Sequence, residues 1–175
     1  LVGVLDDGFP EAGREGEFDA VRAKVETARI CRGSAGHPVS VAQASLLYVY
    51  LDVQYSFDPM LLESDVKVRL EAALGLAGDE ATARSGLFGL NARRLGESEY
   101  ASRIEGTLQS AVGIRWCKVI AFEMFSLGID PVTEPPPPTR VLSDQVNCPA
   151  DQLLQLHRNH LTLTSVAAPN LDPCA

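Results

Sequence analysis

Apolar and polar residues alternate between residues 37 and 57, and this alternation is the clearest β-strand signal in the chain. The residues of one parity are almost all apolar: Val39, Val41, Leu47, Val49, Leu51, Val53, Tyr55 and Phe57. One straight strand from 39 to 57 would be about 60 Å long, far beyond the usual length. Because the alternation falters at Gln43 and Ser45, we expect a bend or bulge there, or two consecutive strands.

Apolar residues three to four positions apart predict three helices. The first begins at Glu17, the second at Asp58-Pro59 as an N-cap followed by proline at N1, and the third at about Ser98. Gly113 is expected to end the third helix. The positions expected to face the core are Phe18, Val21, Val25 and Ala28, then Leu62, Val66, Leu70, Ala73 and Leu74, then Ile104, Leu108, Ala111 and Val112.

Three further segments are predicted to be strands. They are "LVGVLDD" at 1–7, "IRWCKVIAFEMF" at 114–125 and "HLTLTSV" at 160–166. The second of them has apolar residues on both faces, which is typical of a strand inside a covered sheet. Because the chain begins with an apolar run and not with Met, we expect it to start inside a strand of a longer polypeptide.

Two segments interrupt these elements. The glycine-rich excursion after Leu74 has no sustained period, and long excursions are usually functional or mobile. Four consecutive prolines predict a stiff polyproline II linker over 129–140. We therefore expect an α+β domain over 1–128, with two layers and helices mainly on one face of a mixed sheet. Residues 141–175 would form an extended arm, with a short helix near 147–149 and the strand at 160–166.

The charge balance argues against a general nucleic-acid binder, because 23 acidic and 15 basic residues give a net charge of −8. No apolar run approaches the roughly 20 residues that span a bilayer. The four cysteines form no CxxC pair, and a chain of this size does not need disulfides. We expect reduced thiols in a cytosolic environment.

Motifs for catalysis are missing from the sequence: it contains no GxxxxGK[ST] phosphate loop and no GxSxG elbow. The zinc candidates are His157, His160, Cys148 and Cys174, but their spacings match no standard zinc pattern. Cys117 is expected to be a buried, inert thiol in mid-strand. The carboxylates Glu97, Glu99 and Glu105 are expected to be solvated partners of Arg103. We therefore predict no catalytic residue, no cofactor and no metal.

Turn residues and apolar residues follow a fixed order along residues 20–164. They are Gly36, Pro38, Val39 and Val41, then Gly86 to Phe88, then Gly96, Tyr100, Ser102, Ile104, Gly113 and Ile114, and finally the closing segment 153–164. In this order they resemble the C-terminal half of baseplate J-like proteins, which build the baseplate wedges of phage tails and contractile injection systems. The resemblance implies a structural protein without catalysis that joins other baseplate subunits in a six-fold assembly. Such a chain would assemble in the cytoplasm and end in a virion tail or injection particle.

In this interpretation the excursion 78–96 and the arm 129–175 would contact neighbouring subunits. Aromatic residues, arginines and strand leucines give the candidate interface, because Trp, Tyr and Arg concentrate binding energy. The candidates are Phe88, Arg93, Arg94, Tyr100, Trp116, Leu161 and Leu163. Two alternatives stay open: a regulatory or ligand-binding α+β module that acts as a dimer, and a small-molecule hydrolase or transferase with 78–96 as its lid.

Overall fold

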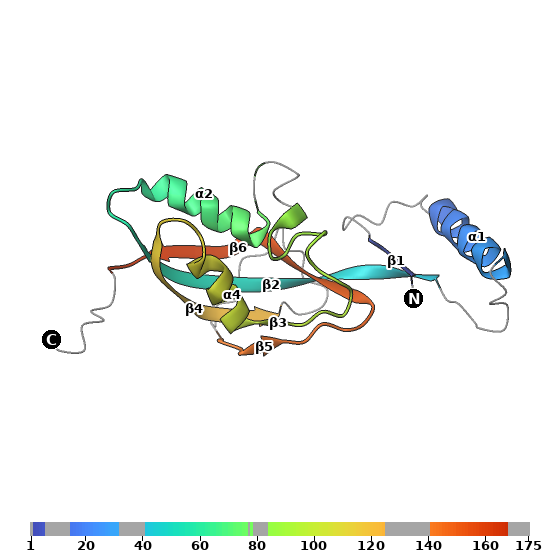
Figure 1. The fold of residues 1–175 in the computed structure, drawn as a ribbon. Helices are drawn as coiled ribbons and strands as arrows, with labels where there is room; N and C mark the ends of the chain where they lie inside the picture. The colour runs from blue at the N-terminus through green and yellow to red at the C-terminus, as the bar shows by residue number, and fades with distance from the viewer. Residues whose placement is uncertain are drawn as a thin grey trace.

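The computed structural model describes residues 2–5, 15–31, 41–76, 78, 84–124 and 141–167, and within these ranges the fold is α+β (Figure 1). Its elements, in chain order, are β1 (Val2–Leu5), α1 (Glu15–Cys31), β2 (Val41–Phe57), α2 (Glu63–Leu74), β3 (Glu99–Tyr100), α4 (Ala101–Gln109), β4 (Ile114–Met124), β5 (Gln145–Val146) and β6 (Gln152–Ser165). The predicted proline-rich linker, the tail after residue 167 and most of the excursion before residue 84 lie outside these ranges.

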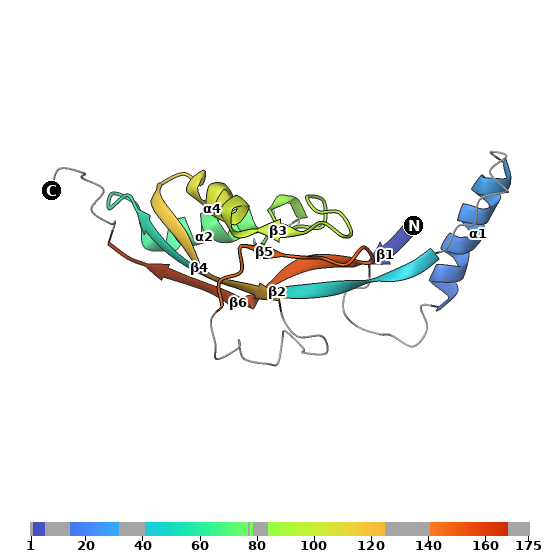
Figure 2. The ribbon, with the colours of Figure 1, turned by 90° about the horizontal axis from the view of Figure 1, so that it is seen from below.

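The strand β2 is the centre of a mixed sheet. It pairs with β1 and β6 in parallel and with β4 antiparallel, while β3 and β5 form a separate two-stranded ribbon. Helices α2 and α4 cover one face of this sheet, and α1 lies at the far end near the start of β2 (Figures 1 and 2). The predicted mixed sheet, with helices mainly on one face, is confirmed.

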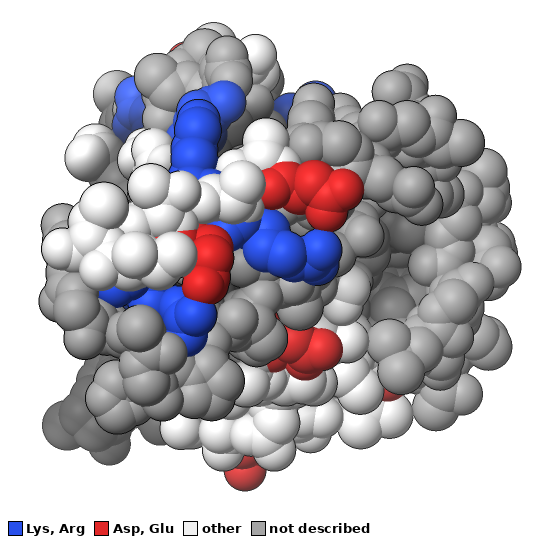
Figure 3. Space-filling view, turned by 90° about the vertical axis from the view of Figure 1, so that its right-hand side faces the viewer, with Lys and Arg blue, Asp and Glu red and all other residues white. Residues whose placement is uncertain are grey.

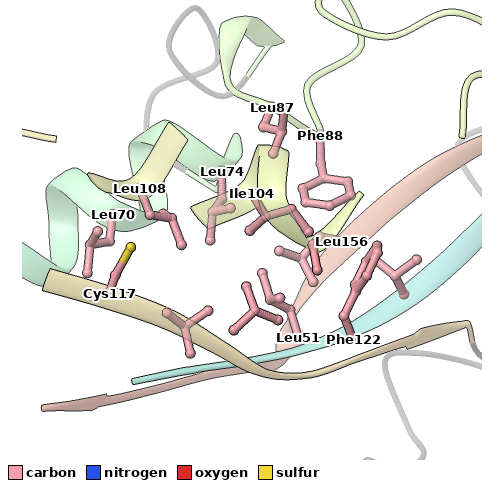
Figure 4. Packing of buried hydrophobic residues seen from close by; sticks show 14 of the residues in the cluster. Leu51, Leu70, Leu74, Leu87, Phe88, Ile104, Leu108, Cys117, Phe122 and Leu156 are labelled. Atoms are coloured by element: carbon pink, nitrogen blue, oxygen red, sulfur yellow. The ribbon is translucent and has the colours of Figure 1, made fainter. Parts of the chain in front are cut away.

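The main core lies between this sheet and the two covering helices. Strand residues of the predicted parity point into it, and Leu70, Leu74, Ile104 and Leu108 meet them from the helices (Figure 4). The opposite face of the sheet carries a smaller cluster around Tyr50 and also buries polar side chains, including Asp52.

The strand β2 is continuous over 17 residues, so of the predicted alternatives near Gln43 and Ser45, that of two consecutive strands is wrong. The pairing partner changes at this point: β1 pairs up to Ala44, and β6 pairs from Ser45 onward. Register shifts lie further along, at Asp52/Val53 and Ser56/Phe57 in the ladder with β4 and between Val49 and Leu51 in the ladder with β6.

Helix α2 begins four residues later than predicted, at Glu63. Asp58 instead closes a turn, because its carboxylate accepts a hydrogen bond from the Met60 N–H (3.0 Å) and its carbonyl accepts one from the Leu61 N–H (2.9 Å). Leu62 therefore precedes the helix and is 69% exposed instead of buried. Further along the helix, Val66, Leu70 and Leu74 are buried as predicted.

Helix α4 is shorter than predicted. Glu99 and Tyr100 belong to β3, and the helix ends at Gln109. Gly113 then turns the chain into β4 at a φ of 96°, a region that favours glycine. Since Val112 lies after the helical turns, it is 74% exposed, against the prediction that it faces the core.

The segment 141–167 differs most from its prediction. No helix forms near 147–149, and the strand begins at Gln152 instead of residue 160. More importantly, β6 pairs along β2 from Ser45 to Tyr55, so it is a strand of the central sheet and not part of a separate arm. Leu154 and Leu156 of β6 belong to the main core. The chain therefore needs this segment to complete its domain.

In the part of the chain that the structure describes, no helix combines the length and apolar character needed to cross a membrane.

Candidate functional site

The excursion after α2 folds back onto the C-terminal end of that helix. The Leu87 N–H donates to the Ala73 carbonyl (2.8 Å), and the Phe88 N–H donates to the Leu74 carbonyl (3.0 Å). These bonds satisfy carbonyls that the last helical turn leaves unpaired. Gly86 allows the approach, because a Cβ there would overlap with the backbone around Gly75. Leu87 and Phe88 consequently point into the main core (Figure 4).

A buried ion pair holds the second half of the excursion. The Nη1 of Arg93 donates to Oε2 of Glu99, and both side chains are 0% exposed. The Nη2 of Arg93 donates to the Glu97 carbonyl oxygen (2.6 Å), and its Cζ lies 5.4 Å from the centre of the Phe88 ring. The guanidinium is thus compensated by a charge, a carbonyl and an aromatic face. Its Nε is buried and has no hydrogen-bond acceptor among the described residues.

Glu97 and Arg103 extend this pair to the surface. The Nη1 of Arg103 lies 2.8 Å from Oε1 of Glu97 and 3.6 Å from Oε2 of Glu99. Oε2 of Glu97 also accepts from the Arg94 N–H (2.9 Å). The hydrogen bond from Arg103, followed by that from Arg94, lowers the pKa of Glu97, and Glu97 in turn raises the pKa of Arg103. Glu97 and Arg103 therefore stay ionised at neutral pH.

The network can position backbone, but its geometry does not suit acid–base catalysis. Glu99 accepts hydrogen bonds from Arg93 and from the Tyr100 N–H (2.9 Å) and has no surface on which a substrate could meet it. Our prediction that Glu99 is solvated is wrong, because β3 carries its side chain inward. Glu97, just before the predicted start of the third helix, closes the turn from Arg94, because its N–H donates to the Arg94 carbonyl and its carboxylate accepts from the Arg94 N–H.

The same region holds the C-terminal segment in place. The Gly96 N–H donates to the Gln152 carbonyl (2.9 Å), and the Cys148 N–H donates to Oγ of Ser98 (3.3 Å). Glu99 itself pairs with Val146 in the ribbon of β3 and β5. The excursion and segment 141–152, both predicted as contacts for other subunits, thus contact one another within this chain.

The seven predicted interface residues divide by exposure. Phe88 and Arg93 are buried, so the prediction that they form an outer surface is wrong for the folded chain. Arg94 is exposed and Tyr100 is nearly half exposed. Partly buried positions are occupied by Trp116 and by two leucines of β6, Leu161 and Leu163.

Sequence reasoning missed the most exposed apolar side chains, which gather at one end of the domain. Met60 is 89% exposed, and Leu62 and Val112 are exposed as well. The turn after β2 and the turn before β4 lie together here, because the Asp58 N–H donates to the Gly113 carbonyl (2.9 Å). We call Met60, Leu62 and Val112 the apolar tip. The sequence did contain a signal for this surface, because Met60 follows Pro59 and Val112 precedes Gly113, and both Pro59 and Gly113 lie in turns.

A second apolar group surrounds the junction of β4 with segment 141–145. Tyr100, Met124, Val141 and Leu142 are each close to half exposed. The Phe122 N–H donates to the Val141 carbonyl (2.9 Å), which fixes this segment against the end of β4. Large side chains with this exposure suit contacts with another protein.

Charges at the α1 end of the molecule are mixed in sign. Figure 3 shows Lys and Arg side chains beside Asp and Glu side chains on the described part of this end. Within α1 itself, Arg22 pairs with Asp19 at 3.1 Å. Such a mixed surface does not provide the continuous basic face that phosphate backbones require.

The described residues include no group of three or more potential metal ligands. His157 and His160 lie with ring centres 6.0 Å apart, and the Cys148 thiol donates to the Gln152 carbonyl (3.2 Å). The described cysteines Cys31, Cys117 and Cys148 are all free thiols, while Cys174 lies outside the described ranges.

Cys117 should react only when the protein unfolds. Burial raises the pKa of its thiol from 9.0 to about 11, and the Glu105 carboxylate adds to this shift. At pH 8 we expect iodoacetamide to modify the exposed Cys31 within minutes and to leave Cys117 intact, as measured by peptide mass spectrometry. Labelling of both thiols at equal rates in the folded chain would contradict this placement.

The same shift predicts a pH dependence of stability. Because the folded pKa lies above the unfolded value, the thiol contributes its full stabilisation below pH 9 and loses it as the pH rises toward about 11. Replacing Cys117 by Ser should remove this contribution to the loss of stability at alkaline pH.

Comparison of the chain with protein-family models finds no match, and comparison with curated proteins finds none either.

Proposed function

We propose that this chain is a structural subunit of a phage-tail-like or contractile injection baseplate, where it holds neighbouring subunits by surface contact and without catalysis. The carrying observation is the apolar tip, because three large apolar side chains stand in solvent on two turns that the fold fixes together. Exposed apolar groups of this kind typically mark sites of protein association.

The order of elements supports the same proposal. A long strand, a helix, a glycine-rich excursion, a second helix and a strand follow one another as the family resemblance implies. The buried pair of Arg93 and Glu99 then makes the excursion a fixed part of the platform. In this proposal the chain assembles in the cytoplasm as one of six copies around a hub and ends in the particle.

The apolar tip can be tested by a matched pair of double variants. Met60→Ser with Val112→Ser removes two of its side chains, and Ile30→Ser with Val68→Ser removes two comparably exposed side chains elsewhere. Both doubles should keep the melting temperature within a few degrees, because exposed substitutions change stability little. In cells that produce the particle, we expect the tip double variant to be incorporated at least tenfold less than the chain itself, and the control double variant equally well.

Incorporation is measured by quantitative mass spectrometry of purified particles. Absence of the chain from tail or injection particles would overturn the proposed function. Equal incorporation of both double variants would overturn the role of the apolar tip.

A further inference from the structure

The two outer edges of the central sheet differ in how their backbone groups are used. On the edge of β4 that faces away from β2, side chains of α4 take the place of a strand. Oε1 of Glu105 accepts from the Val119 N–H (2.9 Å), and Oε1 of Gln109 accepts from the Cys117 N–H (3.0 Å). The Nε2 of Gln109 donates to the Arg115 carbonyl (3.0 Å).

The same edge of β4 is closed further along by the backbone of segment 141–143. The Phe122 N–H donates to the Val141 carbonyl, and the Ser143 N–H donates to the Phe122 carbonyl (3.0 Å). From Arg115 to Phe122, the edge of β4 therefore offers little backbone to another protein.

The outer edge of β6 is different. The Val166 N–H donates to the Tyr55 carbonyl (2.9 Å), which shows that Tyr55 turns its backbone toward β6. Tyr55 is opposite Ser165 in this parallel ladder, so Thr164 and Val166 bond to β2 while Ser165 faces away. By the same alternation, Leu161 and Leu163 also direct their N–H and C=O groups away from β2.

Nothing in the described ranges pairs with these outward groups: no other strand lies on this side of β6. The stretch Leu161–Ser165 also lacks the features that usually protect an edge strand, since "LTLTS" contains no charge and no proline. Its leucines pack toward the core beneath α2, and its threonines lie on the opposite face beside Asp52 and Gln54.

We propose that the outer edge of β6, from Leu161 to Ser165, binds an extended strand of a neighbouring protein by β-augmentation. The backbone groups select a strand, because only a strand presents N–H and C=O groups at the matching repeat. The side chains select an alternating sequence, with apolar residues on the side of Leu161 and Leu163 and polar residues on the side of Thr162 and Thr164.

Charge selects a neutral-to-basic partner. Tyr55 is opposite Ser165, and its hydroxyl donates to Glu63 (3.2 Å) at the start of α2, where Asp65 and Lys67 follow within the next turn. These side chains sum to one negative charge, and the whole chain carries −8. A second copy would place two strongly acidic chains side by side, whereas a lysine or arginine at one end of the incoming strand is attracted.

Two proline variants test the direction of the backbone before any partner is needed. Ser165→Pro removes an N–H that faces outward, so we expect its melting temperature to lie within about 2 °C of that of Ser165→Ala. Thr164→Pro removes an N–H that bonds to β2 and should lower the melting temperature by at least 5 °C. Equal losses in the two proline variants would overturn the proposed edge.

Binding is then measured on the full chain with a synthetic library of eight-residue peptides that alternate apolar and polar residues and carry one terminal lysine. We expect selected peptides to bind the Ser165→Ala variant as they bind the unchanged chain, and the Ser165→Pro variant at least tenfold more weakly. Hydrogen exchange of the Leu161 and Leu163 amides should be fast in the isolated chain and at least tenfold slower with bound peptide.

Three results would overturn the proposal: no selected peptide, equal binding by Ser165→Pro, or slow exchange of these amides in the isolated chain. A dimer of the isolated chain in sedimentation, lost in Ser165→Pro, would identify a second copy as the occupant instead. These readouts do not depend on incorporation into a particle, so the proposed function and this edge can fail separately.

Discussion

Replacing Arg93 by Met should lower the free energy of unfolding by about 3–5 kcal/mol, because it leaves the Glu99 carboxylate buried without its cation. Both side chains are fully buried, so water cannot take the place of the lost partner. Met keeps most of the volume of the arginine stem, which limits any cavity beside Phe88. Urea unfolding at pH 7 measures the change.

The control is Arg103→Met, which removes an arginine from the same network at a position that is nearly half exposed. A change of about 1 kcal/mol or less is expected there, since solvent screens the pair with Glu97. The double variant Arg93→Met with Glu99→Leu should recover much of the lost stability, because it removes both buried charges together. If Arg93→Met alone cost no more than Arg103→Met, Arg93 would not be buried as the structure has it.

Replacing Leu154 by Ala should destabilise the whole domain by about 2–5 kcal/mol, in a single unfolding transition. Leu154 lies opposite Leu47 in the ladder of β6 with β2, and both side chains are buried in the main core. The same lowered unfolding midpoint should be measured by the near-ultraviolet signal of Trp116, which lies on β4, and by far-ultraviolet circular dichroism.

Leu142→Ala is the matched control for Leu154→Ala, since it removes the same atoms from a side chain that is 47% exposed. Its expected cost is below about 1 kcal/mol. Truncation after residue 140 should likewise prevent folding, because it removes β6 and leaves one side of β2 unpaired. A truncated chain that unfolds cooperatively at the original temperature would restore the interpretation of this segment as an arm.

Much of the fold could be predicted because it depends on local periodicity. The alternation along β2 correctly predicted which of its side chains face the core. The spacing of Val66, Leu70 and Leu74 correctly predicted that these residues form the buried side of α2. Boundaries were less predictable. Asp58-Pro59 is typical both of a helix start and of a turn, and only the hydrogen bonds from Asp58 to Met60 and Leu61 show that it is a turn here.

The candidate surface was harder to predict than the fold. Residue type alone indicated Phe88 and Arg93 as contact residues. Phenylalanine also occurs in hydrophobic cores, however, and arginine also occurs in buried ion pairs, as these two do here. Met60 and Val112 were assigned to no surface, because burial at a turn depends on what packs against it. Of the seven predicted residues, Arg94 and Tyr100 are the most exposed, while Leu161 and Leu163 contribute backbone rather than side chains to the proposed edge.

The sequence by itself determined the α+β class, the core-facing side of the residues in β2 and the absence of a general nucleic-acid-binding charge pattern, because these follow from period and composition. Only the tertiary structure decided that β6 completes the central sheet, that Arg93 meets Glu99 in the interior, and that α4 closes one edge of the sheet while no strand of the described residues pairs with the other. Each of these depends on which distant segments come together. Apolar alternation marks a segment as a strand, but it does not specify which strand lies beside it.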